Sequence, residues 1–153
     1  MGFFGKKAQE VSKEDCITMV ENFITNIGLN PSEQRLKGDT IGWVIRRGSA
    51  ITYIMIFEYE NFTSIRIYSP ILYLPEENIL PFYRKCLETN FNLVNCAICV
   101  YEDKVALVVE RPIGGLDPEE LQGMINYLSS VADDLDNKLG DEFGAKILSE
   151  RTE

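Results

Sequence analysis

Side chains that commonly carry out catalysis are scarce in this chain of 153 residues, because it contains no histidine. Histidine is the usual general base and the commonest transition-metal ligand, so Ser-His-Asp and Cys-His catalysis are both excluded. Serine with lysine, or paired carboxylates, would still allow chemistry, but no spacing in the sequence singles out such a group. The sequence therefore predicts a protein that is not an enzyme and holds no cofactor.

Cys96-Ala97-Ile98-Cys99 matches the CxxC motif of redox and zinc sites. The segment has the composition of a β-strand, in which residues three apart point to opposite faces, so the two sulfur atoms would not meet. No second CxxC completes a set of four zinc ligands. We therefore interpret both cysteines as buried structural thiols.

A run of carboxylates near the C-terminus is the other candidate for chemistry, and it comprises Asp133, Asp134, Asp136, Asp141 and Glu142. Calcium prefers oxygen ligands and tolerates loose geometry. The run lacks the alternating acids, glycine and distant glutamate of an EF-hand loop. A solvated helix face is therefore the preferred interpretation, and no metal is expected.

The net charge of the chain argues against some classes of binding partner. Fifteen Lys and Arg stand against 24 Asp and Glu, which gives a formal net charge of −9. This charge repels phosphate backbones and anionic lipids, so neither nucleic acid nor a membrane is an expected partner. No apolar run reaches the roughly 18 residues of a membrane span and no signal peptide is recognisable, so a cytoplasmic protein is predicted.

The periodicity of apolar residues predicts three helices and five strands. The helices extend from Ser12 to Gly28, from Pro75 to Asn90 and from Asp117 to Gly140. Pro81 lacks an amide hydrogen, so a later start or a bend of the second helix is the open alternative. The strands cover residues 41–47, 50–58, 62–68, 93–101 and 105–110. The order α-β-β-β-α-β-β-α predicts an α+β fold with an antiparallel five-stranded sheet. One domain is expected over residues 12–140, with a loosely ordered leader (1–11) and tail (141–153).

The run from Ala50 to Phe57 is apolar on both faces that a strand would present. Short connections on both sides make it the middle strand of a three-stranded meander. The predicted helices would cover one face, and the other face would need a second subunit or a bound peptide. The alternative, in which the helices cover all of the apolar sheet surface, stays open because Ser64 and Arg66 indicate that one side of the next strand is exposed to solvent.

Three segments resemble the YbjN family within the type III secretion chaperone-like superfamily. They are Leu74-Pro75-Glu76-Glu77, the helix exit at Thr89-Asn90, and Gly115-Leu116-Asp117-Pro118-Glu119-Glu120-Leu121. The similarity runs from about Ser12 to Leu139. It implies an α+β domain that forms homodimers and, as in the secretion chaperones, binds an extended client segment over hydrophobic patches on the sheet and first helix.

We therefore predict a dimeric chaperone or adaptor that holds an unstructured segment of a client protein. The alternative is a regulatory protein that binds a folded partner through the same surface, and an enzyme would be favoured only by a pocket with converging carboxylates. The predicted peptide-binding groove consists of Phe23, Ile27, Trp43, Ile45, Tyr53 and Met55. The predicted dimer interface consists of Phe82, Tyr83, Cys86, Cys96 and Ile98.

Overall fold

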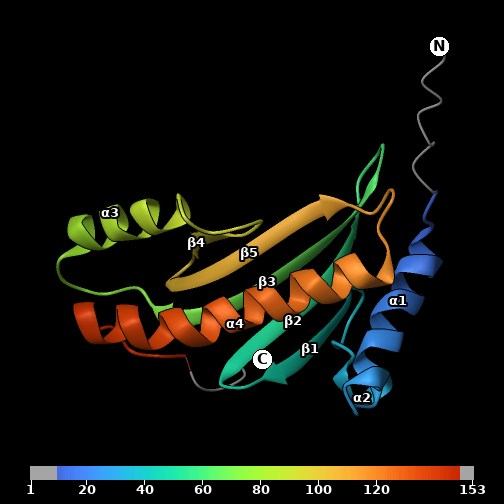
Figure 1. Cartoon of the computed structure of the whole chain (residues 1–153), viewed down its shortest axis with the longest axis horizontal. Coiled ribbons are helices and arrows are strands. Elements are labelled where there is room, and N and C mark those ends of the chain that lie inside the picture. The colour runs from blue at the N-terminus through green and yellow to red at the C-terminus, as the bar shows by residue number, and fades with distance from the viewer. Residues whose placement is uncertain (1–9, 149–153) are drawn as a thin grey trace.

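The computed structural model describes residues 10–148, in which helices pack on a five-stranded sheet (Figure 1). The elements in chain order are α1 (Lys13–Asn26), α2 (Pro31–Gln34), β1 (Ile41–Arg47), β2 (Ala50–Glu58), β3 (Thr63–Tyr73), α3 (Ile79–Asn90), β4 (Ala97–Tyr101), β5 (Lys104–Pro112) and α4 (Pro118–Phe143). The predicted α+β class, the five strands and their order are confirmed. The single turn α2 is an addition to the three predicted helices.

The strands lie in the order β1-β2-β3-β5-β4, and all neighbours are antiparallel. As predicted, β2 lies between β1 and β3. Strand β3 is longer than predicted and continues past Tyr68 to Tyr73. It passes through Pro70, which lacks an amide hydrogen, by means of a register shift between Pro70 and Leu72.

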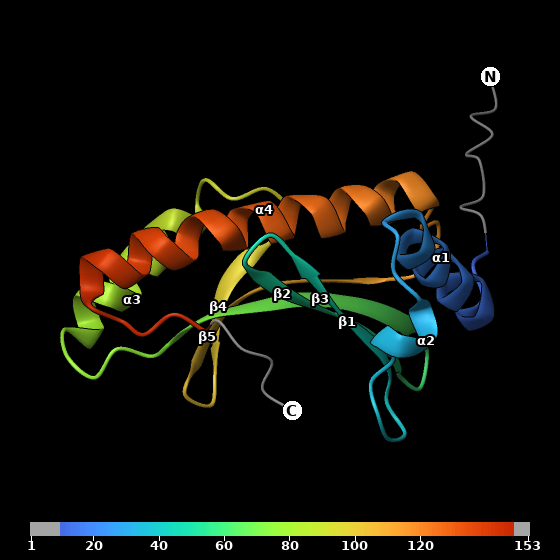
Figure 2. The same cartoon turned by 90° about the horizontal axis from the view of Figure 1, so that it is seen from below.

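One face of the sheet carries the hydrophobic core. Helix α4 packs along β2, β3 and β5, and α1 packs against α4 on the same side (Figure 2). The short α2 lies at the β1 edge, and the opposite face of the sheet carries no helix of the described chain (Figure 2). The largest fully buried side chains are Trp43, Phe82, Ile24, Ile45, Ile54, Ile65, Ile67, Leu72, Leu107, Leu121, Ile125 and Leu128.

Helix α1 begins at the residue that its capping chemistry predicts. The Ser12 hydroxyl accepts a hydrogen bond from the Asp15 amide at 3.0 Å, and the Asp15 carboxylate accepts one from the Ser12 amide at 3.0 Å. This reciprocal pair satisfies two amides that a helix start leaves without partners. At the start of α4, Asp117 similarly accepts from the Glu120 amide at 2.8 Å.

Two elements start later than the first residue predicted for them, and for the middle helix this is one of the two alternatives that Pro81 left open. Helix α3 begins at Ile79 rather than Pro75, which places Pro81 in its first turn. Amides of the first turn have no partner within the helix, so the missing N–H of Pro81 costs little there. Strand β4 begins at Ala97 rather than Leu93, because Asn95 adopts a left-handed φ of 54° and turns the chain just before it.

The C-terminal end of α4 also differs from the prediction. The helix passes Gly140 and ends at Phe143, where Gly144 adopts a φ of 61°. The chain then returns to β3: the Tyr73 amide donates to the carbonyl of Lys146, and the Leu148 amide to that of Ile71, both at 2.9 Å. Residues 141–148 are therefore part of the packed fold, not of a loosely ordered tail. Residues 1–9 and 149–153 of the predicted leader and tail lie outside the described residues.

The uncovered sheet face as a candidate binding site

The register of the strands determines which side chains share the face that the helices leave open. Residues paired directly across antiparallel strands lie on the same face. Tyr53 pairs with Tyr68, which in turn pairs with Val108. The next row contains Met55, Arg66 and Glu110. These rows run across β2, β3 and β5 and form the centre of the open face.

Aromatic rings form the floor of this face. The rings of Tyr53 and Tyr68 stack with centroids 4.9 Å apart and an interplanar angle of 9°. Tyr101 meets Tyr68 edge-on at 6.0 Å. Tyr68 and Tyr101 border a shallow groove of about 580 Å³, which we call the sheet groove, while Tyr53 is buried beside Tyr68. It is lined by Met55, Phe57, Arg66, Tyr68, Cys99, Tyr101, Val108 and Glu110.

One ion pair fixes the polar part of the sheet groove. The Arg66 Nε donates to a Glu110 carboxylate oxygen at 2.7 Å, and its guanidinium lies 4.6 Å from the centroid of the Phe57 ring. Glu110 also accepts hydrogen bonds from the Ser64 and Tyr59 hydroxyls at 2.6 and 3.0 Å. Burial alone raises the pKa of Glu110, but these hydrogen bonds outweigh it and leave the pKa below its usual range. These hydrogen bonds thus favour the charged form of Glu110.

The hydroxyl and thiol groups of the sheet groove are poorly suited to nucleophilic chemistry. Burial raises the pKa of Tyr68, Tyr101 and Cys99, so all three stay protonated near neutral pH. Cys96 packs instead against the core on the other side of the sheet, as the alternation predicted. The groove therefore offers apolar and aromatic contact area rather than a reactive group.

The structure does not bring the six predicted groove residues together. Tyr53 and Met55 lie on the open face as required. Trp43 pairs with Ile54 and Ile45 with Thr52, which places both on the covered face, where Trp43 is 0% and Ile45 is 1% exposed. The sequence reasoning therefore combined residues from two opposite faces of the sheet.

The two residues predicted from the first helix belong to the covered side as well. Phe23 is buried in the core, and Ile27 packs against that core while remaining partly exposed. Both line a separate small cavity of about 180 Å³ with Pro118 and other residues of α1 and α4. The groove residues that the sequence reasoning missed are Phe57, Arg66, Tyr68, Cys99, Tyr101, Val108 and Glu110.

The predicted dimer residues lie mainly inside the protomer. Phe82, Cys86 and Ile98 are buried, and Cys96 is partly buried against the same core. Tyr83 is the one of the five that is exposed, so this set cannot form an interface without unpacking the core. The opposite side of α3 exposes apolar residues at steps of three and four. We call this set, which consists of Leu80, Tyr83, Leu87 and Phe91, the α3 stripe.

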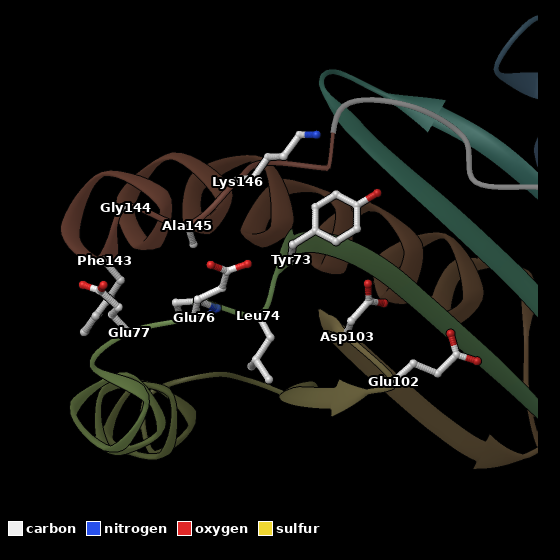
Figure 3. A pocket seen from close by; sticks show the side chains of 11 residues that line it. Tyr73, Leu74, Glu76, Glu77, Glu102, Asp103, Phe143, Gly144, Ala145 and Lys146 are labelled. Atoms are coloured by element: carbon white, nitrogen blue, oxygen red, sulfur yellow. The ribbon is translucent and has the colours of Figure 1, made fainter.

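A second cavity, of about 920 Å³, lies where β3 leaves the sheet (Figure 3). We call it the acidic pocket, because four carboxylates line it: Glu76 and Glu77 before α3, and Glu102 and Asp103 in the β4–β5 turn. In Figure 3, Glu77 and Glu102 lie on opposite sides of the pocket, so the carboxylates do not converge. A hydrogen bond from Lys104 lowers the pKa of Asp103. The arrangement thus lacks the closely spaced acid and base of a catalytic pair.

The acidic run on α4 is tied to protein groups. Asp133 accepts a hydrogen bond from the Ser49 amide at 2.9 Å, and Asp134 pairs with Lys138 at 2.6 Å. Asp136 is buried and accepts from the Ser49 hydroxyl at 3.1 Å. Within residues 10–148, no group of three or more His, Cys, Asp or Glu side chains could hold a metal ion. No helix in that same range is long and apolar enough to cross a membrane.

Comparison with known proteins agrees with this geometry. Residues 14–150 match the sequence model of a family described as T3SS (YopN, CesT) and YbjN peptide-binding chaperone 1. No curated protein matches the chain significantly. The fold is similar to that of a chain in the crystal structure of the ExsC-ExsE complex, with a TM-score of 0.64 and 13% sequence identity, over 85% of this chain and 97% of that chain. At this identity the likeness shows a shared fold.

Proposed function

The chain belongs to the family of T3SS (YopN, CesT) and YbjN peptide-binding chaperones, as its sequence motifs predicted, and from this premise we propose that the sheet groove holds an extended segment of a client protein. The observation that carries the proposal is the aromatic floor of Tyr68 and Tyr101, with Tyr53 stacked on Tyr68, on a sheet face without helix cover. The protein would then act as a non-enzymatic chaperone or adaptor.

The chemistry of the sheet groove suits an extended apolar segment. Tyrosine and phenylalanine rings provide large contact areas at a small cost in side-chain entropy, and Met55 can adapt its shape to different residues. A peptide in extended conformation directs every second side chain to the same face. Apolar residues at alternate positions of the client would therefore rest on the groove floor.

The edges of the sheet favour binding through side chains rather than addition of a strand. The side chain of Asn90 accepts from the Ile98 amide at 2.7 Å and donates to the Ile98 carbonyl at 3.3 Å, which occupies the β4 edge near the start of the strand. At the β1 edge, the Leu36 amide donates to the Gly42 carbonyl at 2.9 Å. Strand addition needs a row of free backbone groups, and the chain itself occupies part of both rows.

We also propose that the protein is a homodimer and that the α3 stripe forms the interface. Leu80, Leu87 and Phe91 are 77%, 70% and 90% exposed, which is a large apolar area for an isolated acidic protein. In a two-fold dimer the same stripe from both copies would meet, so each exposed side chain finds an apolar partner. This interface leaves the sheet groove free for the client.

The proposed site of action is the cytoplasm. All four cysteines, Cys16, Cys86, Cys96 and Cys99, are free thiols. Burial raises the pKa of each of them, to about 11 for Cys16 and Cys86. Unpaired thiols are usual in a reducing compartment and uncommon in secreted proteins of this size.

Selection from a phage-displayed library of random 15-residue peptides tests the proposed function. The immobilised protein is expected to enrich peptides with apolar or aromatic residues at alternate positions. The variant Met55→Glu, which places a charge on the half-buried groove floor, should lose this enrichment. The variant Leu80→Glu, with its charge on the α3 stripe, serves as the matched control and should retain it. Equal enrichment by wild type and Met55→Glu would contradict the assignment of the groove.

A further inference from the structure

One cross-strand row links the acidic pocket to the sheet groove, and we infer that the client segment carries a lysine or arginine that enters this pocket three or four residues beyond its last apolar contact. This inference rests on the proposed function and adds the chemical class of the client. It is independent of the dimer. Three properties of the pocket carry it: its position, its charge and its aromatic wall.

The position of the acidic pocket follows from one cross-strand row. Tyr73, Lys104 and Tyr101 pair directly across β3, β5 and β4, so all three lie on the open face. Tyr101 lines the sheet groove and Tyr73 lines the acidic pocket. The Lys104 Nζ lies 5.9 Å from the Tyr101 ring and 6.0 Å from the Tyr73 ring.

These two distances limit the separation of the Tyr73 and Tyr101 rings to about 12 Å. An extended peptide advances by about 3.3 Å per residue. Three or four residues are therefore enough to lead from the last contact in the sheet groove into the acidic pocket. A longer insertion between the apolar and basic residues of the client is not required.

The charge of the acidic pocket favours a cation. The ammonium group of Lys104 is already paired within the β4–β5 turn, with Asp103 at 2.8 Å and with Glu102 at 3.6 Å. Among residues 10–148, neither Glu76 nor Glu77 makes an ion pair. Lys146 is the one cation among the described residues that line the pocket. Even with Lys104 counted from beside it, the four carboxylates outnumber the lysines, so the pocket keeps an excess of negative charge.

The end of α4 adds to this excess. The 26-residue helix terminates at the pocket, with Phe143 and Gly144 in the lining, and its last turn contains no basic residue. The carbonyl end of a helix carries about half a negative charge, which a lysine or arginine in the last turn would normally offset. An incoming basic side chain would supply this missing partner.

The aromatic wall of the pocket already attracts cations from the protein itself. The Nζ atoms of Lys146 and Lys104 lie 5.5 and 6.0 Å from the centroid of the Tyr73 ring, within the range of cation–π attraction. A guanidinium or ammonium group with a long aliphatic stem would find the same favourable environment. The four carboxylates of the lining outnumber the two lysines beside Tyr73, so an acidic client residue would meet net repulsion.

Peptide selection with two proteins tests the inference. The random library is panned on the wild type and on the triple variant Glu76→Gln, Glu77→Gln, Glu102→Gln, which retains Asp103 for Lys104. The wild type is expected to enrich Lys or Arg three or four positions after the alternating apolar residues. The triple variant should lose the basic preference and keep the apolar one.

The affinity of a selected peptide gives the quantitative test. Fluorescence anisotropy compares the peptide with a copy in which the lysine is Nε-acetylated, which removes the charge and keeps the stem. Acetylation should weaken binding to the wild type 5- to 20-fold and binding to the triple variant less than 2-fold. Apolar enrichment without basic preference, or no effect of acetylation on the wild type, would overturn the inference and leave the proposed function intact. Failure of the wild type to enrich any peptide would overturn both.

Discussion

The ring of Tyr68 lies flat on the ring of Tyr53, 4.9 Å away, on the sheet face that the helices leave open. The two residues are direct partners in the β2–β3 ladder, so the strand register itself creates the stack. Offset or parallel aromatic pairs add about 0.5–1.5 kcal/mol beyond the area that they bury. The stack therefore holds the Tyr68 ring, which lines the sheet groove, against the buried ring of Tyr53.

Replacement of Tyr68 should affect peptide binding through the ring and not through the hydroxyl. We expect Tyr68→Ala to weaken a library-selected peptide by about 10-fold, which corresponds to about 1.4 kcal/mol. Tyr68→Phe keeps the stack on Tyr53 and should bind within about 2-fold of the wild type. Fluorescence anisotropy measures both affinities, with urea unfolding as a check on the fold. Wild-type affinity in Tyr68→Ala would show that the peptide binds elsewhere.

Replacement of Trp43 tests whether the covered face of the sheet takes part in peptide binding. Its ring is fully buried on the covered face, so Trp43→Ala should lower the free energy of unfolding by about 3–5 kcal/mol. Trp43→Phe should cost less because it fills more of the space. In the fraction that remains folded, the peptide affinity is expected to match the wild type. Loss of peptide binding in Trp43→Phe with unchanged stability would instead show that Trp43 belongs to the binding site.

Charges on the α3 stripe should prevent dimerisation without unfolding the protein. Leu87 is 70% exposed, so Leu87→Glu removes apolar surface from the proposed interface and places two like charges across the two-fold axis. Light scattering is expected to give a monomeric mass for this variant and a dimeric mass for the wild type. Arg84→Gln changes an exposed residue of the same helix, paired with Glu88, and is the matched control. A wild type that is monomeric at high micromolar concentration would contradict the dimer.

Asp136 should stabilise the fold at low pH and lose this contribution as the pH rises. Burial, with smaller contributions from Asp133 and Asp134, raises the pKa of Asp136, and one of its oxygens is buried without a hydrogen-bond partner among residues 10–148. A raised pKa in the folded state means that the protonated acid is the favoured form. The stabilising contribution is complete below the ordinary pKa of 3.8 and is lost as the pH rises through the raised value.

Asp136→Asn mimics the protonated acid and tests this pH dependence. We expect the variant to raise the free energy of unfolding at pH 7 and to change it little at pH 3.5, as measured by urea unfolding. Asp134→Asn is the control of opposite sign, because it removes an exposed pair with Lys138 and should cost about 0.3–0.5 kcal/mol at pH 7. Equal effects of Asp136→Asn at both pH values would show that the carboxyl group is not protonated preferentially in the fold.

The sequence contained enough information for the element order and for part of the register. Gly48-Ser49 is a two-residue connection that makes Arg47 the partner of Ala50, and counting back from there pairs Trp43 with Ile54. This count alone assigns Trp43 and Tyr53 to opposite faces. Our prediction used the apolar character of both residues and not the count, and for this reason it mixed the two faces.

Other features could not be obtained from periodicity. Strand β5 pairs with β3 although β4 precedes it in the chain, and this order brings Val108 and Glu110 next to Tyr68 and Arg66. Only long-range packing decides between the two possible orders. The same holds for the dimer residues: α3 is apolar on both sides, and its contacts with β4 and with Phe143 of α4 decide that Phe82 is buried.

The two occupied edges of the sheet have a consequence for how much the protein can bind. An open edge is a template on which further strands can add without limit, and segments that need a chaperone are prone to add in this way. Here Asn90 closes the start of the β4 edge and Leu36 part of the β1 edge, while the face between them carries no helix. On the proposed function, binding through this face would limit uptake to the client segments that the face can hold, so the protein would shelter an aggregation-prone segment without becoming the seed of its polymer.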